Sequence, residues 1–461
     1  MRTGLVIFAG CLFSLATGST AARAKDLALG GAIIAPGEVI EHGWVVIHEG
    51  RIAKVTEDAP QGDGVELLET GGLIFPGFID LHNHPMYSVF SHWKAPQVFA
   101  NRYEWRRLQA YKDAIGTPGG ELQRKDDQTF CDLDENAEVM ALIGGTTSLT
   151  GISGRKTEPP VPGCVAGLVR NLDWASGFDG PGVGHERVKN ALGITLGDMK
   201  PDEAASNEAA LASGGLDLLL MHIAEGSPQD LETSLEFAAL EGRGFLRPHV
   251  AVIHGTGLVE DDFRVMRAAD VALIWSPRSN IELYGVTTDI AAAIRQRVTI
   301  ALAPDWAPTG SINMLGELRF ANRYSRDHLA GALSDERLFE MATSIPARIA
   351  GIEDKVGRIT PGLYADLIVL KGNPAQPFKS LVNARPTDVQ LVLIAGKPMY
   401  GSPQFLSKLR VSTESVDVCG TLMGLNKSEL PDGPLAAVRN RLKLDLAQYK
   451  LSLAPIAECA P

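Results

Sequence analysis

The chain has 461 residues, of which 45% are hydrophobic and 21% are charged, and it carries a formal net charge of −12. This length exceeds one small core and fits a large domain with a smaller one, and the composition excludes a disordered or low-complexity protein. The negative charge opposes association with nucleic acid through bulk electrostatics, so we expect no nucleic-acid partner.

The first 24 residues have the features of a secretory signal peptide. Arg2 precedes an apolar run at residues 4–15 that is too short to span a bilayer, and Ala22 and Ala24 occupy the positions that a signal peptidase reads. We therefore expect cleavage after Ala24 and a secreted or periplasmic mature protein. A buried N-terminal helix is one alternative, and a lipoprotein signal ending at Cys11 is a weaker one. No later segment is long and apolar enough for stable membrane insertion.

Both ends of the mature chain are rich in short strands. At residues 25–70 and again at 355–400, apolar or alternating runs are separated by turns that contain glycine. We predict that these two segments pair to form one small β-sandwich built from both chain ends. Residues 401–461 are expected to form a tail with one amphipathic helix, roughly at residues 434–449.

The central segment, residues 71–354, alternates between strand and helix patterns. About eight apolar, β-branched runs occur there, and helical stretches such as 228–241, 260–269 and 289–296 lie between them. Such alternation predicts a parallel α/β architecture, and the number of runs favours a (β/α)8 TIM-like barrel. A doubly wound sheet is the alternative, but no glycine-rich phosphate turn supports it.

Four cysteines remain after the signal peptide: Cys131, Cys164, Cys419 and Cys459. An even number in an oxidising compartment favours disulfides, and no CxxC spacing suggests a metal site. Of the three pairings that four cysteines allow, we favour the two local ones, Cys131 with Cys164 and Cys419 with Cys459. Four unrelated buried thiols are the alternative.

Side chains that can bind a metal follow several of the predicted barrel strands. His82 and His84 close the first run, His222 the fifth, His254 the sixth and Asp305 the eighth. The carboxyl ends of barrel strands converge on one mouth, and residues two apart in a strand face the same side. Imidazole and carboxylate are suitable zinc ligands, and bound zinc lowers the pKa of a water molecule to roughly 7. We therefore predict a divalent-metal site, with zinc preferred over iron or manganese.

The order of the motifs resembles that of the amidohydrolase superfamily, in its cytosine-deaminase-like and triazine-hydrolase-like branch. The resemblance is carried by PGFIDLHNH at residues 76–84, HIAE at 222–225, SPRSN at 276–280, PDW at 304–306 and GRITPGLYADL at 357–367. It covers nearly all of the mature chain to about residue 400. Each motif is moderately specific, and their order and spacing together are highly specific.

The resemblance also implies roles for individual residues. The metal ligands would be His82, His84, His222 and Asp305. Asp305 would in addition accept a proton from the metal-bound water, and Glu225 would act as general acid and base. His254 would polarise the substrate or hold the hydroxide. Asn280 and Trp306 are candidate substrate-binding residues, with core or hinge roles as the alternative.

The number of metal ions is inferred from a departure from the family pattern. Two-metal members bridge their ions with a carboxylated lysine on the fourth strand, and the runs expected as strands three and four, 167–173 and 191–196, contain no lysine. We therefore expect one ion, with two ions bridged by a glutamate or aspartate as the alternative. Residues 101–106, which mix aromatic and charged side chains, are expected to line the entrance or to pack on the barrel rim. We assign no role to His42, His48 and His328, and leave His92, His185 and His249 open.

The function implied is hydrolysis of a carbon–nitrogen bond other than a peptide bond by a metal-bound hydroxide. The small-molecule substrate would be an amide, a cyclic amide or a heterocycle that is deaminated. Hydrolysis of a lactone, peptide or carbon–halogen bond is the first alternative, because the same hydroxide serves all of these. A catalytically inactive binding barrel is the second. The oligomeric state is left open, with a homo-oligomer among the alternatives.

Overall fold

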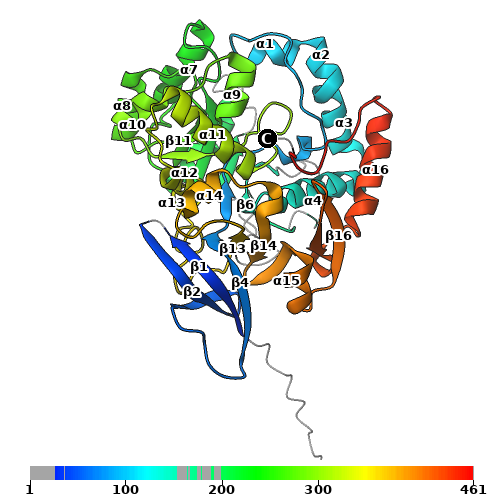
Figure 1. The fold of residues 1–461 in the computed structure, drawn as a ribbon. Coiled ribbons are helices and arrows are strands. Elements are labelled where there is room, and N and C mark those ends of the chain that lie inside the picture. The colour runs from blue at the N-terminus through cyan, green and yellow to red at the C-terminus, as the bar shows by residue number, and fades with distance from the viewer. Residues whose placement is uncertain are drawn as a thin grey trace, which may run out of the picture.

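The structure, a computed structural model, describes residues 26–35, 37–152, 164, 167–173, 178, 188–191 and 199–459. It has a mixed α/β fold in which parallel strands with helices around them lie above one large antiparallel-rich sheet (Figure 1). The mixed α/β class predicted from the sequence is therefore confirmed. None of the helices in the described part combines the length and apolar character that crossing a bilayer requires.

The large sheet has nine strands in the order β16-β17-β15-β14-β13-β4-β1-β2-β3. The N-terminal strands are β1 (Asp26–Ala35), β2 (Glu38–His48), β3 (Arg51–Thr56) and β4 (Val65–Pro76). The C-terminal strands are β13 (Leu367–Leu370), β14 (Val389–Ile394), β15 (Lys397–Gly401), β16 (Thr413–Val418) and β17 (Thr421–Asn426).

The two chain ends meet in this sheet through β4. Its first part pairs with β1, and its last residues pair with β13, where Ile74 lies opposite Val369. Because β4 is twelve residues long, it can hold a partner on each side. The strands of both chain ends thus form one hydrogen-bonded sheet with an apolar cluster of its own, and its folding into the two layers of a sandwich stays a prediction.

Eight parallel strands follow one another in two sheets. The first sheet contains β5 (Phe78–Asp80), β6 (Thr146–Leu149) and β7 (Arg170–Asn171). The second contains β8 (Val188–Ala191), β9 (Leu218–Ile223), β10 (Val250–His254), β11 (Ala272–Trp275) and β12 (Ile300–Leu302). β9 and β10 are buried along their whole length, which is typical of parallel strands covered on both faces.

The two parallel sheets are joined at one edge, between β5 and β12, and not at the other, between β7 and β8, within the described residues. An isolated parallel bridge joins Asn83 to Asp305, just beyond β5 and β12. No ladder joins β7 to β8 within the described residues. The fourth strand also differs from expectation, because β8 begins before the predicted run at 191–196, most of which lies outside the described residues.

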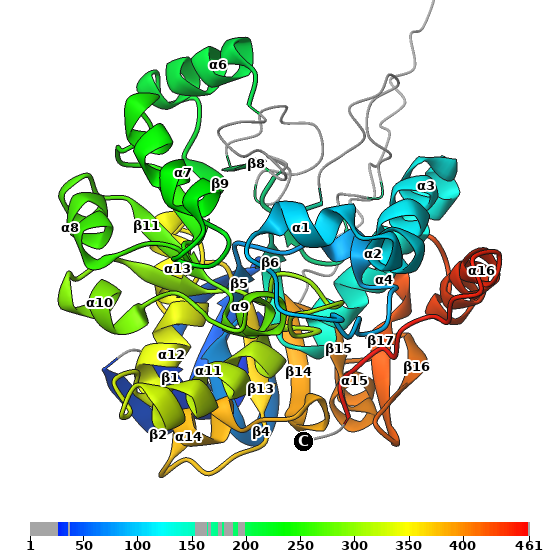
Figure 2. The ribbon, with the colours of Figure 1, turned by 90° about the horizontal axis from the view of Figure 1, so that it is seen from above.

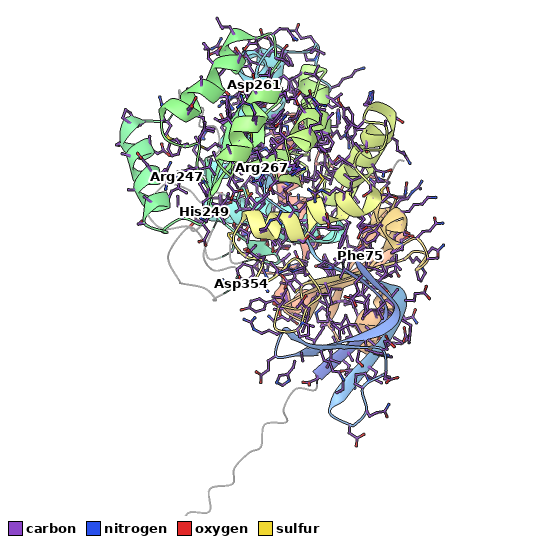
Figure 3. All side chains as sticks on the ribbon, turned by 90° about the vertical axis from the view of Figure 1, so that its left-hand side faces the viewer. Phe75, Arg247, His249, Asp261, Arg267 and Asp354 are labelled. Atoms are coloured by element: carbon purple, nitrogen blue, oxygen red, sulfur yellow. A yellow bond between two sulfur atoms is a disulfide. The ribbon has the colours of Figure 1, made fainter. Side chains whose placement is uncertain are left out.

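Helices cover the parallel strands and join them to the large sheet. They are α1 (Arg102–Arg107), α2 (Gln109–Tyr111), α3 (Thr117–Lys125), α4 (Asp127–Ile143), α6 (Pro201–Ala212), α7 (Leu231–Gly242), α8 (Glu260–Ala268), α9 (Pro277–Tyr284), α10 (Ile290–Arg295), α11 (Met314–His328), α12 (Asp335–Ala342), α13 (Ser344–Ile349), α14 (Pro377–Val382), α15 (Pro403–Lys408) and α16 (Leu435–Ala447). Both views place α1–α3 on the side of the molecule away from the large sheet (Figure 2). At the junction with that sheet, Phe75 of β4 packs on Phe339 of α12, with ring centroids 5.5 Å apart (Figure 3).

The predicted disulfide pairs are both present. Cys131 of α4 is bonded to Cys164, and Cys419 is bonded to Cys459. The second bond ties the last described residue to the turn between β16 and β17. The helix predicted near residues 434–449 is found as α16, which lies against α4 (Figure 1).

Candidate metal centre and active site

The strand ends bring the predicted metal ligands to one place. His82 and His84 follow β5, His222 lies in β9, and Asp305 follows β12. The backbone N–H of Asp305 donates to the carbonyl of His82 at 3.1 Å, and that of His84 donates to the carbonyl of Asp305 at 2.8 Å. These bonds hold the first and last parallel strands in register, so the positions of their side chains are set by backbone contacts.

The backbone turns sharply where two of the site residues emerge. His254 at the end of β10 has a φ of 66°, and Asp305 has a φ of 70°. Non-glycine residues rarely adopt this left-handed region, and such strain concentrates at functional sites. The turn points each side chain toward the shared mouth instead of continuing the alternation of the strand.

The ligand atoms lie close enough to share an ion. Nε2 of His82 is 3.0 Å from Oδ1 of Asp305, and Nε2 of His84 is 3.4 Å from the same oxygen. The rings of His82 and His222 are 4.8 Å apart. Three groups of donors each lie within 4.8 Å of one another: His82, His84 and His222; His82, His254 and Asp305; and His222, Glu225 and His254. The groups share members, so their donor atoms form one continuous cluster.

The chemistry of these residues fits a divalent metal. In the described part of the chain, neither ring nitrogen of His82 has a hydrogen-bond partner, and nor does Nδ1 of His222, although both rings are buried. Leaving a buried polar atom unsatisfied costs about 1–3 kcal/mol, so a ligand is needed to offset it. Imidazole nitrogen and carboxylate oxygen are the donor types of zinc and of other first-row metals.

The protonation states agree with metal binding. Burial lowers the pKa of His82 to about 4 and that of His222 well below its usual value. Burial acts to raise the pKa of the Asp305 carboxyl, but neighbouring His82 and His84 overcome it and hold this pKa well below its ordinary value. At neutral pH the imidazoles are therefore neutral and the carboxylate is ionised, which are the forms that bind metal.

Glu225 is held beside this cluster by side chains from other elements. Its Oε1 accepts a 2.5 Å hydrogen bond from the hydroxyl of Tyr284, and its Oε2 lies 3.4 Å from Nη1 of Arg102. The indole N–H of Trp105 in turn donates to the hydroxyl of Tyr284 at 2.8 Å. Nε2 of His254 lies 3.8 Å from Oε2 of Glu225. The carboxylate is thus oriented toward the cluster of proposed metal ligands.

Asn280 has a different place from the one predicted. It is fully buried and does not line the pocket. Its Oδ1 accepts a 2.8 Å hydrogen bond from Nδ1 of His254. Because an amide oxygen only accepts, the proton of His254 is on Nδ1, and Nε2 is left to face the site. The expectation that Asn280 touches substrate is therefore corrected: it orients His254.

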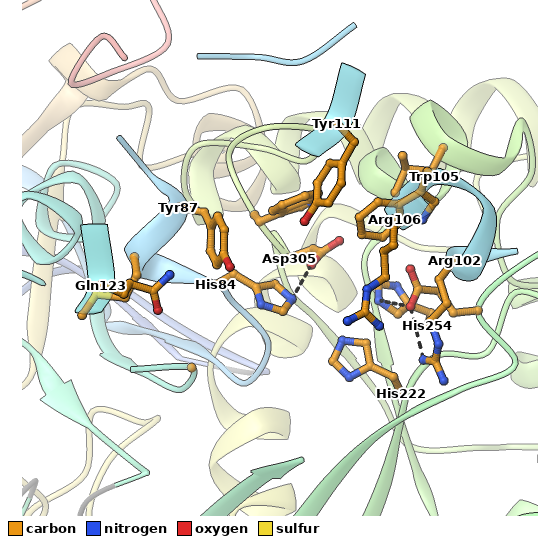
Figure 4. A pocket seen from close by; sticks show the side chains of 15 residues that line it. His84, Tyr87, Arg102, Trp105, Arg106, Tyr111, Gln123, His222, His254 and Asp305 are labelled. Carbon is orange, nitrogen blue, oxygen red and sulfur yellow. Dashed lines mark hydrogen bonds and ion pairs between the residues drawn. The ribbon is translucent and has the colours of Figure 1, made fainter. Parts of the chain in front are cut away.

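A pocket of about 270 Å³ opens above the cluster (Figure 4). His84, His222, His254 and Asp305 line its base. Its walls include four aromatic side chains, which are Tyr87, Trp105, Tyr111 and Trp306. The ring of Trp306 is within 6.2 Å of each of the other three rings. As expected, Trp306 and part of the segment 101–106 face the entrance, with Arg102, Trp105 and Arg106 among the lining residues.

Several residues of the site were missed in the sequence, among them Tyr87, Tyr111, Tyr284 and Glu236. Tyr284 lies four residues after Asn280 on α9, so helical spacing places both on one face, and this signal was available. Tyr111 and Glu236 carry no comparable local signal. Glu236 accepts hydrogen bonds from Arg102 at 2.9 Å and from the hydroxyl of Tyr103 at 3.0 Å, and so completes the partners of Arg102.

The fourth parallel strand changes the argument about metal number. β8 contains Lys189, whereas the predicted run at 191–196 contained no lysine. The absence of a lysine can no longer be used to infer a single ion. Of the histidines left open, His92 and His249 contact Glu282 and the carbonyl of Asp217 and do not line the pocket, and His185 lies outside the described residues.

A parallel α/β fold with histidines and an aspartate at the strand ends defines the class of metal-dependent hydrolases. Comparison with known proteins agrees with this class. The model of the amidohydrolase family matches residues 202–399. This match covers less than half of the chain, and it agrees with the resemblance to the amidohydrolase superfamily that the motifs carry.

The individual relatives are distant in sequence, but their alignments cover most of each chain. A 5'-deoxyadenosine deaminase of Methanothermobacter thermautotrophicus is 23% identical over 401 residues, which cover 78% of this chain and 89% of the relative. A zinc-bound adenosine deaminase of Xanthomonas campestris has a TM-score of 0.70 at 17% identity, covering 92% of this chain and 99% of that one. Guanine deaminase of E. coli has a TM-score of 0.64 at 17% identity, covering 81% and 99%.

Proposed function

We propose that this enzyme deaminates a planar amino-heterocycle by hydrolysis. The observation that carries the proposal is the aromatic pocket directly above the histidine–aspartate cluster, with Glu225 held at its base. Aromatic side chains stack on flat rings, and such contacts contribute about 0.5–1.5 kcal/mol beyond the area that they bury. The relatives that are named deaminases support the same reaction.

In this proposal, one divalent ion, preferably zinc, is held by four ligands: His82, His84, His222 and Asp305. The continuous cluster that the donor groups form supports a single ion, and a bound ion supplies a water molecule of lowered pKa. Asp305 accepts the proton of the attacking water. Glu225 would take up the other proton of the water and pass it to the amine, which leaves as ammonia when the carbon–nitrogen bond breaks, and Asp305 would return its proton to the product. Nε2 of His254 would contact the ring position under attack.

We also propose the larger arrangement around the site. The parallel strands β5–β12 follow one another in chain order, and the bridge between Asn83 and Asp305 joins the first to the last, which supports one (β/α)8 barrel spanning residues 71–354. Residues 25–70 and 355–400 would form the smaller domain. Two disulfides support export to a secreted or periplasmic location, because disulfides persist in oxidising compartments.

The first test measures metal and product together. Elemental analysis of the purified protein should give about one equivalent of metal per chain, and a panel of amino-purines, amino-pyrimidines and amino-triazines should release ammonia. His222→Ala should lose both properties, whereas His42→Ala, which changes an exposed histidine on β2, should keep both. Turnover of lactones without ammonia release would replace the proposal with the first alternative. A protein that takes up no zinc, iron or manganese would favour a binding barrel.

A further inference from the structure

A second cavity, of about 360 Å³, lies between α11, the segment after α14 and the disulfide-tied C-terminal segment. Four arginines and one carboxylate line it: Arg319, Arg323, Arg326, Arg385 and Glu458. It shares no lining residue with the pocket above the metal ligands. In a chain with a net charge of −12, this cavity is a local reversal of charge.

The arginines are brought together by both local and tertiary structure. Arg319, Arg323 and Arg326 are spaced at i, i+4 and i+7, which places them on one face of α11. Nη1 of Arg319 donates a 2.6 Å hydrogen bond to the carbonyl of Ala384, and this bond fastens the helix beside Arg385. The disulfide between Cys419 and Cys459 forms the third wall. The cavity is thus assembled from three segments that are far apart in sequence.

The positive charge in this cavity is only partly neutralised. Glu458 accepts two hydrogen bonds from Arg278, at 3.0 and 3.1 Å, and lies 3.8 Å from Nη2 of Arg319. Within the described residues, no ion pair is formed by Arg323, Arg326 or Arg385. Burial lowers the pKa of Arg319, and the positive charges of the neighbouring arginines add to this shift although Glu458 opposes it. An anion in the cavity would relieve this repulsion.

We propose that the arginine cavity binds a soluble small molecule that carries a phosphate group. The guanidinium fork matches phosphate oxygens in pairs, and several arginines that line one cavity favour a doubly charged anion over a single carboxylate. A phospholipid headgroup offers the same chemistry. The net negative charge of the chain opposes its approach to an anionic bilayer, and for this reason we assign the site to a soluble ligand.

Calorimetric titration of the purified full chain with inorganic phosphate, against chloride at equal ionic strength, tests the site. The native protein should bind inorganic phosphate saturably. Arg323→Gln combined with Arg385→Gln should weaken it at least about tenfold. The matched control is Arg264→Gln with Arg267→Gln, which removes the same charge from exposed α8 and should leave binding unchanged (Figure 3). Equal affinity in the two double variants, or no saturable binding, would overturn the proposal.

Two further measurements are needed. The first distinguishes loss of the binding site from a folding defect, and the second distinguishes a soluble ligand from a lipid headgroup. Replacing Arg323 and Arg385 by lysine keeps the charge but removes the fork, so phosphate binding should weaken while the unfolding temperature without phosphate stays at the native value. Sedimentation with phosphatidylglycerol-containing vesicles, compared with pure phosphatidylcholine, distinguishes the source. Protein that stays in the supernatant while phosphate binds supports the soluble ligand. Arginine-dependent retention on the anionic vesicles would overturn that assignment in favour of a lipid headgroup.

Discussion

At Glu225, side chains from separate elements meet one carboxylate. Tyr284 of α9 donates to one oxygen, and Arg102 of α1 lies beside the other. These contacts orient the carboxylate at the pocket, which Arg102 also lines. The sequence places Glu225 three residues after His222, but the residues that hold it lie 59 and 123 positions away along the chain.

The general acid–base role of Glu225 is tested by Glu225→Gln. Glutamine can still accept the hydrogen bond from Tyr284 but cannot carry a proton, so we expect kcat to fall about 10²–10⁴-fold with metal content unchanged. Steady-state kinetics on a substrate that releases ammonia measures kcat, and elemental analysis measures metal content. Glu232→Gln, at an exposed position of α7, is the control. Turnover within a few-fold of the native value in Glu225→Gln would remove Glu225 from the mechanism.

Arg102 is expected to stabilise the folded protein. It is 3% exposed and lies 2.9 Å from Glu236 as well as beside Glu225. Arg102→Met would leave two buried carboxylates without a counter-charge, which costs about 3–5 kcal/mol when a buried ion pair is broken. Urea unfolding measures the loss, and Arg107→Met on the exposed side of the same helix should cost little. Equal midpoints for the two variants would show that Arg102 is not needed for stability.

At the scale of elements, α4 joins the parallel strand β6 to the C-terminal helix α16. Arg441 of α16 donates to both oxygens of Asp132, at 2.7 and 2.6 Å, and the disulfide from Cys131 leaves the same helix. The adjoining face of α4 buries Asp134 and Glu138, four residues apart. Burial first, and then the nearby charge of Asp134, raises the pKa of Glu138 well above its usual value.

This buried acid pair predicts that stability falls as pH rises. A carboxyl whose folded pKa is raised stays protonated in the folded protein, whereas the unfolded chain releases the proton above about pH 4.3. The contribution of this carboxyl to the free energy of unfolding is therefore complete at low pH. It declines by up to about 1.4 kcal/mol per pH unit as the pH rises toward the pKa in the folded protein.

The decline is measured by urea unfolding between pH 5 and 8. Glu138→Gln should flatten it, because an amide does not ionise and can still accept the 2.6 Å hydrogen bond from the N–H of Leu168. Glu241→Gln, at an exposed position of α7, should leave the pH dependence as it is in the native protein. If the free energy of unfolding of Glu138→Gln fell with pH as steeply as that of the native protein, Glu138 would not be the cause of the decline.

For the whole molecule, the proposed metal ligands lie at the ends of the first and last parallel strands. His82 and His84 follow β5, and Asp305 follows β12, so an ion held between them would also fasten the two ends of the strand series. A ligand that binds only the folded state stabilises it by roughly 4 kcal/mol at 1,000 times its Kd.

Metal removal should therefore lower stability as well as activity. We expect a chelator to reduce the unfolding temperature of the native protein and added zinc to restore it. In His222→Ala the shift should be much smaller, and in His42→Ala it should equal the native shift. Differential scanning calorimetry measures the unfolding temperature of each protein with and without the chelator. If the chelator lowered this temperature equally in all three proteins, the stabilising ion would lie elsewhere.

The sequence by itself determined the α/β class, the local disulfide pairs and the positions of the metal-competent residues. Apolar runs define buried strands, and residues such as His82 and Asp305 stand directly after them, so chain-local patterns contain this information. The alternation of strand and helix was likewise readable from 71 to 354. The start of β8, and with it Lys189, was misplaced because a short strand has few residues to mark its ends.

Only the tertiary structure decided which residues surround these positions. It turned Asn280 toward His254 instead of the substrate, brought Arg102 to Glu225, and joined both chain ends in one sheet along β4. It also placed Arg385 beside Arg319 to form a basic cavity in an acidic chain. The physical reason is the same in each case: these contacts join segments that are distant in sequence, and no local periodicity encodes the packing that brings them together.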